Sequence, residues 1–253
     1  MQRDKPFRIR SCPALVLGTA VVNLILLQNS LAQDTKQLLI TTEESIPTSM
    51  VKESGKVVYG RTADKIHEIM ARSHVSYQMQ SMSWNRAFEL AKSQPDTCVF
   101  STARTPERES MFKWIGPVAA GTWVVVGPQD RLGKITQLEQ LKDSNIGVNL
   151  GDVLTGYLGQ RGLNVVRSND DDTSLKNLAM GRLDYWASDF SEANAKLAKH
   201  NLKDQLAILF SFGSVDYYLA CNAKVSDEMV DSMKASLKEM KADGTAEKIE
   251  ARY

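Results

Sequence analysis

The sequence contains few of the residues on which metal sites and disulfide-rich scaffolds depend. Its 253 residues include only three histidines and three cysteines. His67, His74 and His200 have no metal-ligand spacing with any cysteine. We therefore expect neither a metal ion nor another cofactor.

A surplus of either charge is missing as well. The chain has 31 basic and 30 acidic residues, which give a formal net charge of +1. Nucleic-acid-binding domains need a basic face, so nucleic acid is not an expected partner. Gly151, Gly156 and Gly159 lack the spacing and the Gly-Lys-Ser/Thr ending of a phosphate-binding loop. No Ser, His and Asp set has the context of a nucleophile, and we expect no enzyme.

The sequence also lacks a hydrophobic run long enough to cross a membrane. Residues 14–27 form an apolar stretch of about 14 residues behind a basic segment, whereas a transmembrane helix needs about 20. A small-x-small cleavage signal follows at residues 30–32. This pattern predicts a secretory signal peptide over residues 1–32 and a mature chain that is free in the periplasm. No cysteine follows the cleavage site, so no lipid anchor is indicated.

Two cysteines remain in the expected mature chain, Cys98 and Cys221. In an oxidising compartment they could form a disulfide. Both lie in apolar runs, where a buried free thiol is just as ordinary. The sequence leaves both states open.

Strand-like and helix-like patterns alternate along the rest of the chain. We predict strands at 38–42, 75–82, 98–103, 122–126, 145–149, 163–167, 183–187, 206–210 and 217–221. We predict helices at 62–73, 84–93, from Pro106 onward, 138–141, 173–180, 191–200 and 227–241. Such alternation is typical of an α/β fold with a mostly parallel sheet and helices on its faces.

Two passages rich in small residues could connect two lobes. Residues 119–121 and 211–214 could absorb the dihedral changes of a hinge, or they could be two ordinary turns. The first interpretation predicts a first lobe of residues 33–120 plus 214–253. Its second lobe comprises residues 121–213.

The segment from Cys98 to Arg108 joins a predicted strand to a predicted helix. Thr105 suits the N-cap and Pro106 the first helical position. Arg108 would then lie in the first turn, where the helix dipole disfavours a cation by about 0.3 to 1 kcal/mol. Its partner could be Glu107 or Glu109 in a surface ion pair, or a bound carboxylate.

Motifs along the whole mature chain resemble one protein family. They lie at residues 55–60, 84–86, 101–108, 112–117, 138–148, 181–184 and 241–244. In this order they are similar to extracytoplasmic solute-binding proteins of ABC transporters, of the polar amino-acid type known as family 3. The resemblance implies a two-lobed clamshell, the type II periplasmic binding protein-like fold, in which each lobe has a mixed sheet flanked by helices and two strands cross over. It also implies a monomer that binds an amino-acid-like or carboxylate-bearing solute and delivers it to an inner-membrane ABC permease.

The resemblance assigns roles to three residues in particular. Ser101 would hold the amino group of the solute, Arg108 its α-carboxylate, and Asp189 on the second lobe its ammonium group. The turn at Asp152 and Val153 would add backbone donors to the carboxylate. A fixed cation and a fixed anion on opposite lobes can both be satisfied when a zwitterion bridges them.

Three further residues are candidates, each with an ordinary structural alternative. Trp84 could cover the solute or pack in the core, and Arg104 could join the site or pair with Glu44 or a solvent anion. Glu44, or its neighbour Glu43, could reach the cleft from the end of the first strand or be an exposed acid.

The chain also departs from the family pattern at several positions, near residues 46–50 and 60–61 and at two site positions. Ala103 stands where a second hydroxyl is usual, and Asp152 adds an acid that could repel a carboxylate or attract a cationic solute. Two alternative functions therefore stay open. One is an enzyme that dehydrates cyclic amino acids, with Glu43, Glu44 or Asp152 as acid or base. The other is a sensory or partner-docking domain.

Overall fold

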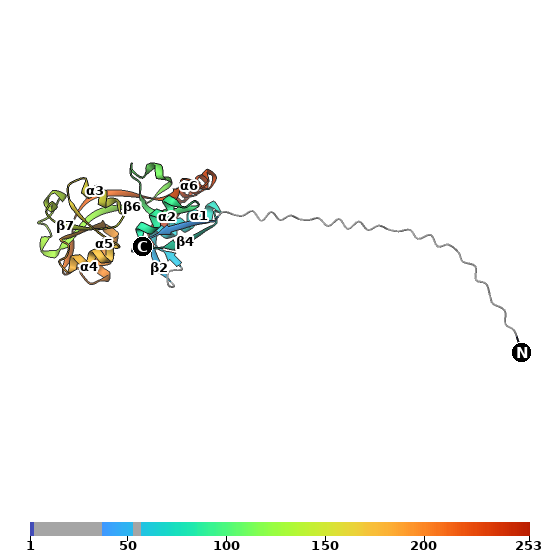
Figure 1. Cartoon of the computed structure of the whole chain (residues 1–253), viewed down its shortest axis with the longest axis horizontal. Helices are drawn as coiled ribbons and strands as arrows, with labels where there is room; N and C mark the ends of the chain where they lie inside the picture. The colour runs from blue at the N-terminus through green and yellow to red at the C-terminus, as the bar shows by residue number, and fades with distance from the viewer. Residues whose placement is uncertain (3–36, 53–56) are drawn as a thin grey trace. The chain divides into compact units, whose positions relative to one another are not determined.

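A computed structural model describes residues 1–2, 37–52 and 57–253 of the chain (Figure 1). The predicted signal peptide lies outside these ranges, apart from its first two residues. The strands are β1 (Leu38–Thr42), β2 (Met50–Lys52), β3 (Val57–Tyr59), β4 (Tyr77–Ser81), β5 (Thr97–Ala103), β6 (Phe112–Pro128), β7 (Asn145–Asn149), β8 (Asn164–Ser168), β9 (Tyr185–Asp189) and β10 (Leu206–Asn222). The α-helices are α1 (Arg61–Ser73), α2 (Trp84–Ser93), α3 (Val153–Gly159), α4 (Asp171–Ala179), α5 (Phe190–Lys199), α6 (Asp227–Ala242) and α7 (Thr245–Glu250). In this part of the chain no helix is long and apolar enough to cross a membrane.

Eight strands form one mixed sheet in the order β4-β1-β5-β10-β6-β9-β7-β8. β1 pairs in parallel with β4 and β5, and β7 pairs in parallel with β8 and β9. The two 17-residue strands β6 and β10 pair with each other in antiparallel fashion at the centre. Each outer group of strands is therefore joined to the other through these two shared strands.

The hydrophobic core is divided between the two ends of this sheet. One cluster packs the apolar faces of α1 and α6 on β1 and β5, with Ile66, Ile69 and Met233 fully buried. Two other clusters pack β7, β9 and their helices, with Ile146 and Trp186 fully buried. Accordingly, α1, α2 and α6 group around β4 while α3, α4 and α5 group around β7 (Figure 1). The predicted two-lobed α/β class is confirmed.

The predicted connections between the lobes lie inside the two long strands. Residues 119–121 belong to β6 and residues 211–214 to β10, and Gly121 pairs with Val215. The two strands predicted at 206–210 and 217–221 are thus one continuous strand. The lobe boundaries at residues 120/121 and 213/214 stay a prediction.

The helix predicted from Pro106 does not form. Residues 106–108 make a turn, in which the Arg108 amide donates to the Thr105 carbonyl at 3.0 Å, and a short 3₁₀ helix, η2 (Glu109–Met111), follows. Phe112 and Trp114 are already buried in β6, so only eight residues separate the two strands. The helix-dipole argument for Arg108 is therefore wrong.

Other short elements were not predicted. Helix α3 begins at the expected turn of Asp152 and Val153, helix α7 follows the predicted C-terminal helix, and β2 pairs with β3 as a small separate sheet. These elements contain three to seven residues, too few to show a periodic apolar pattern.

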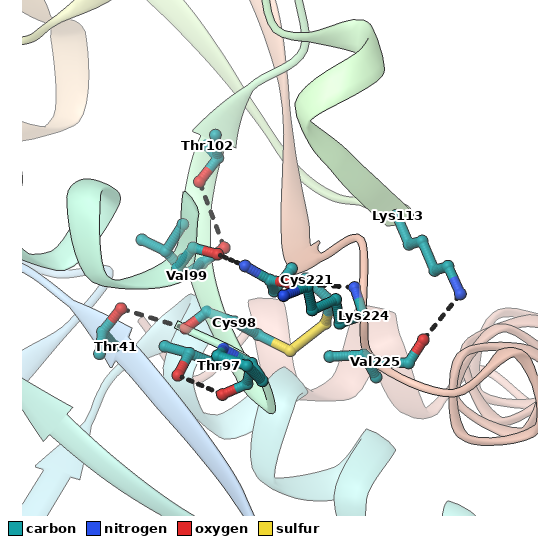
Figure 2. Close-up of a disulfide and its surroundings, with 12 residues drawn as sticks. Thr41, Thr97, Cys98, Val99, Thr102, Lys113, Cys221, Lys224 and Val225 are labelled. Carbon is teal, nitrogen blue, oxygen red and sulfur yellow. Dashed lines mark hydrogen bonds between the residues drawn. A yellow bond between two sulfur atoms is a disulfide. The ribbon is translucent and has the colours of Figure 1, made fainter. Parts of the chain in front are cut away.

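Cys98 and Cys221 form a disulfide between β5 and β10 (Figure 2). The two residues are directly opposite in the antiparallel register, and neither is exposed to solvent. The Thr41 hydroxyl donates to the Cys98 carbonyl at 3.0 Å, which ties β1 to the same place. The structure thus selects the disulfide from the two states that the sequence left open.

Candidate functional site

A cavity lies where the two lobes meet. Side chains from the end of β1 and from α1, α2 and β5 line it on one side, and side chains from α3, α4, β9 and α5 on the other. The central strands β6 and β10 contribute Trp123 and Tyr217. Its volume, measured as the space open to the centres of water molecules, is about 80 Å³, enough for a small solute.

Most of the predicted site residues lie around this cavity. Six of the eight line it: Trp84, Ser101, Arg108, Asp152, Val153 and Asp189. The other two, Arg104 and Glu44, do not line it. The structure thus brings these six residues together, while their roles in binding stay predictions.

Arg104 and Glu44 face separate hollows. Arg104 forms a two-pronged ion pair with Glu109, with nitrogen–oxygen distances of 2.7 and 2.5 Å, and lies over the ring of Trp114. The ion pair lies at the surface, but its partner is Glu109 and not Glu44, the acid that the sequence suggested. Glu44 is exposed and lies beside a hollow near Lys199, whereas its neighbour Glu43 lines the cavity.

Ser101 reaches the cavity because the backbone is irregular at this point. Its φ is 58°, in the left-handed region that residues other than glycine seldom adopt. The register between β5 and β10 shifts here, between Tyr218 and Ala220. Such bulges re-aim side chains at functional sites. A strand pattern in the sequence could not show this.

Arg108 is held by backbone carbonyl groups. One terminal nitrogen donates to the Ala103 carbonyl at 3.3 Å and the other to the Gly151 carbonyl at 3.1 Å. Its guanidinium also lies 4.6 Å from the ring centre of Phe88. Burial lowers the pKa of Arg108, and the nearby charge of Asp152 acts in the opposite direction.

Hydrogen bonds cross the cleft at several places. The Trp84 indole nitrogen donates to the Gly151 carbonyl at 3.0 Å, so that carbonyl accepts from both Trp84 and Arg108. The Asn149 amide donates to Glu43 at 2.8 Å. Ser45 also donates to Glu192, and Arg61 to Ser191. The walls of the cavity therefore contact each other directly.

Asp189 has two structural partners in addition to its place at the cavity. Its carboxylate caps α5 by accepting from the Ser191 amide at 2.9 Å, and it accepts from the Thr122 amide at 3.1 Å. Burial raises its pKa, and these hydrogen bonds oppose the shift. A Cβ on Gly121 would lie 2.2 Å from its Oδ2 atom. Glycine at this position leaves the space that the carboxylate occupies.

Sequence reasoning missed two acids of the second lobe. Asp171 accepts from the Trp186 indole at 3.1 Å, and Glu192 is bonded to Lys196 at 3.2 Å. Both line the cavity. Asp171 lies in a run of three aspartates at the start of α4, which is also what an ordinary helix N-terminus shows. Nothing in the sequence distinguishes the one that faces the cleft.

The carboxyl groups in the cavity have raised pKa values. Burial, reinforced by Glu192 and Asp152, raises the pKa of Asp171 to about 8. Burial and the charge of Asp171 raise the pKa of Glu43 well above its usual value. Burial also raises the pKa of Asp152 and of Glu192. A negative field of this kind favours a positively charged occupant.

Metal ligation finds no support in the described ranges. No group of three or more His, Cys, Asp or Glu side chains there could hold a metal ion. The acids of the cavity are bonded instead to helix amides, an indole, an asparagine amide and a lysine.

Solved structures define the class of this fold. An ancestral arginine-binding protein bound to arginine matches with a TM-score of 0.77 and 23% identity, over 86% of this chain and 98% of that chain. A histidine kinase sensor domain with similarity to periplasmic binding proteins matches with a TM-score of 0.80 and 16% identity, over 87% and 97%. An amino acid ABC transporter substrate-binding protein from Streptococcus pneumoniae, bound to L-arginine, matches with a TM-score of 0.75 and 15% identity, over 87% and 95%. The chain therefore has the periplasmic binding protein-like fold.

The family follows from the sequence itself. Residues 38–253 match the family of bacterial extracellular solute-binding proteins, family 3, and the chain belongs to that family. No curated protein sequence is significantly similar to the chain.

Proposed function

We propose that this protein captures a small amino acid or related amine, with an ammonium or guanidinium group, in the periplasm and delivers it to the permease of an ABC importer. The observation that supports the proposal is the cavity itself, which takes charged side chains from both lobes of a solute-binding fold. A solute that contacts both walls stabilises the arrangement in which they meet. The arginine-bound relatives of the same fold are consistent with a nitrogen-rich solute.

The binding step can be tested by thermal unfolding with a panel of amino acids, amines and organic acids. We expect one compound or a small group of related compounds to raise the midpoint, because binding to the folded state adds RT ln(1 + [L]/Kd) to its stability. A complete panel without any stabilising compound would contradict the proposal.

Two neighbouring acids provide a matched pair of variants. Glu43 lines the cavity, and Glu44 faces the hollow beside it. We expect Glu43→Gln to reduce the ligand-induced shift of the midpoint strongly and Glu44→Gln to leave it unchanged. The reverse result would show that the solute lies at the residue that the sequence favoured.

The delivery step needs a separate experiment in cells. We expect deletion of the gene to abolish high-affinity uptake of the solute identified in the panel. Expression of the wild-type protein should restore uptake, while Glu43→Gln should not. Normal uptake in the deletion strain would argue for the sensory alternative, because the protein would then bind the solute without importing it.

A further inference from the structure

The cavity holds more negative than positive charge. Five carboxyl groups line it, from Glu43, Asp152, Asp171, Asp189 and Glu192. Among the described residues, two cationic side chains, Arg61 and Arg108, line it with them, and the ammonium of Lys196 is bonded to Glu192. With every group ionised, two negative charges remain without a counter-charge.

The two lining arginines are already engaged by the protein. Both terminal nitrogens of Arg108 donate to the carbonyls of Ala103 and Gly151. One terminal nitrogen of Arg61 lies 3.2 Å from Glu250, and the other donates to Ser191 at 3.3 Å. A carboxylate is gripped best by two parallel N–H groups of one guanidinium. The terminal nitrogens of both arginines therefore already contact protein oxygens, with which an incoming carboxylate would compete, while the Nε atom of Arg61 has no hydrogen-bond partner among the described residues.

The protein supplies a carboxylate of its own beside Arg108. Asp152 follows Gly151, whose carbonyl Arg108 contacts, and its charge interacts with that of Arg108. One Asp152 oxygen accepts from the Leu154 amide at the start of α3, at 2.7 Å. A carboxylate of the solute that approached Arg108 and the Leu154 amide would therefore be repelled by the negative charge of Asp152.

A second observation points to a ligand that forms hydrogen bonds with the cavity wall. The Thr62 side chain lines the cavity and is fully buried, and its hydroxyl oxygen has no hydrogen-bond partner among the described residues. Buried hydroxyl groups are normally paired. An ammonium or guanidinium N–H would satisfy this oxygen and neutralise the neighbouring acids.

From these contacts we infer that the solute bound in this cavity is an aliphatic diamine or guanidino-amine that carries two positive charges and no carboxylate. The inference rests on the proposed function, since it names the chemical class of the solute for the same cavity. Asp152 takes the place of the carboxylate that an amino acid would bring. The remaining acids neutralise the two cationic ends.

Calorimetric titration with matched pairs of compounds tests the inference. Putrescine and ornithine, cadaverine and lysine, and agmatine and arginine differ within each pair by the α-carboxylate alone. We expect the amine of at least one pair to bind about tenfold or more tightly than its amino acid, because specificity is a difference of affinities set partly by repulsion. Tighter binding of the amino acid in every pair that binds would overturn the inference and leave the proposed function intact. Failure of all six compounds would overturn the inference alone if another solute of the wider panel binds, and both proposals if none does.

Substitution of Asp152 tests the cause of the preference. Asp152→Ser removes the charge beside Arg108 and keeps a side chain that can cap α3. We expect the preference for the amine to fall about tenfold or more, because the carboxylate of the amino acid no longer meets a like charge. Asp170→Ser is the control: Asp170 caps α4 in the same way, at 2.6 Å from the Thr173 amide, and does not line the cavity.

Circular dichroism of both variants establishes that they fold. An unchanged preference in a folded Asp152→Ser protein would overturn the role of Asp152, and Asp152→Asn repeats the test with a side chain of the same shape. Asp170→Ser should keep the wild-type preference. An equal loss in both variants would show that helix capping, and not the charge at the cavity, sets the preference.

Discussion

Gly121 determines whether Asp189 can occupy its position at the cavity. The residue lies on β6, and an added Cβ would meet the Asp189 carboxylate at 2.2 Å and the Tyr217 ring at 2.6 Å. Distances below 3 Å cannot be accommodated without movement of one partner. The Asp189 carboxylate is held in place by two hydrogen bonds: it caps α5 by accepting from the Ser191 amide, and it accepts from the Thr122 amide. A methyl group at residue 121 would therefore displace the Asp189 carboxylate and weaken both of these hydrogen bonds.

We expect Gly121→Ala to lower the free energy of unfolding by about 1 to 3 kcal/mol, the range typical of overpacking in a well-packed site. Denaturant unfolding measures this change. Gly156→Ala is the matched control, because Gly156 lies in α3 with no atom near the added Cβ, and alanine is the better helix former. The control should be neutral or slightly stabilising. Equal stability of Gly121→Ala and wild type would show that Asp189 can move at little cost.

The first-strand acids show the limit of sequence reasoning at the residue scale. β1 ends at Thr42, and the next two residues are both glutamates. Adjacent residues of an extended chain point to opposite sides. The sequence pattern places the end of the strand only to within a position or so, and therefore cannot tell which of the two glutamates points toward the cavity. Glu43 lines the cavity and Glu44 does not. Asp171 and Glu192 were missed for a similar reason, because a helix start does not reveal which of its acids faces the cleft.

At the scale of elements, periodic patterns of apolar residues predicted several strands and helices correctly. The predicted bounds of β1, β7 and α2 agree with the structure, since their apolar positions follow the period of a strand or a helix over five to ten residues. The predicted helix after β5 failed because capping residues alone do not make a helix. Thr105 and Pro106 suit a helix start, but they also suit the turn that the structure shows.

The disulfide joins the two strands that carry Ser101 and Tyr217 to the cavity. Cys98 and Cys221 are 123 positions apart in the sequence, so the disulfide closes a long loop of the chain. A cross-link of this kind restricts the unfolded chain, and loss of a native disulfide typically costs about 2 to 5 kcal/mol. We expect protein refolded under reducing conditions to unfold at a lower denaturant concentration than oxidised protein. Native mass spectrometry of both samples verifies their redox state, and coincident unfolding curves would contradict the prediction.

At the scale of the whole molecule, two lobes bring one acid of the first lobe and four acids of the second to the same cavity. Glu43 comes from the first lobe and Asp171 from the second, and the charge of Asp171 contributes to the raised pKa of Glu43. The fold class and the family pattern were evident from the sequence because they depend on long segments. The excess of acids was not, because it arises only when residues far apart in sequence meet.

The pH dependence of stability reports directly on these acids. Asp171 has a pKa of about 8 in the folded protein, raised from 3.8 mainly by burial and then by Glu192 and Asp152. Between these two pH values the folded state holds a proton that the unfolded state has lost. The contribution of this group to stability is therefore present below about pH 4 and is lost as the pH rises toward 8.

We expect Asp171→Asn to remove this part of the pH dependence. In urea unfolding between pH 5 and pH 8, the free energy of unfolding of the wild type should fall more steeply with pH than that of the variant, by up to about 1.4 kcal/mol per pH unit.

A bound dication should reverse the trend, because it favours the ionised acids and therefore binds more tightly as the pH rises. Calorimetry in two buffers of different ionisation enthalpy would detect the protons released on binding. Parallel stability profiles of wild type and variant, together with binding that releases no proton, would show that the acids of the cleft are ionised at every pH tested.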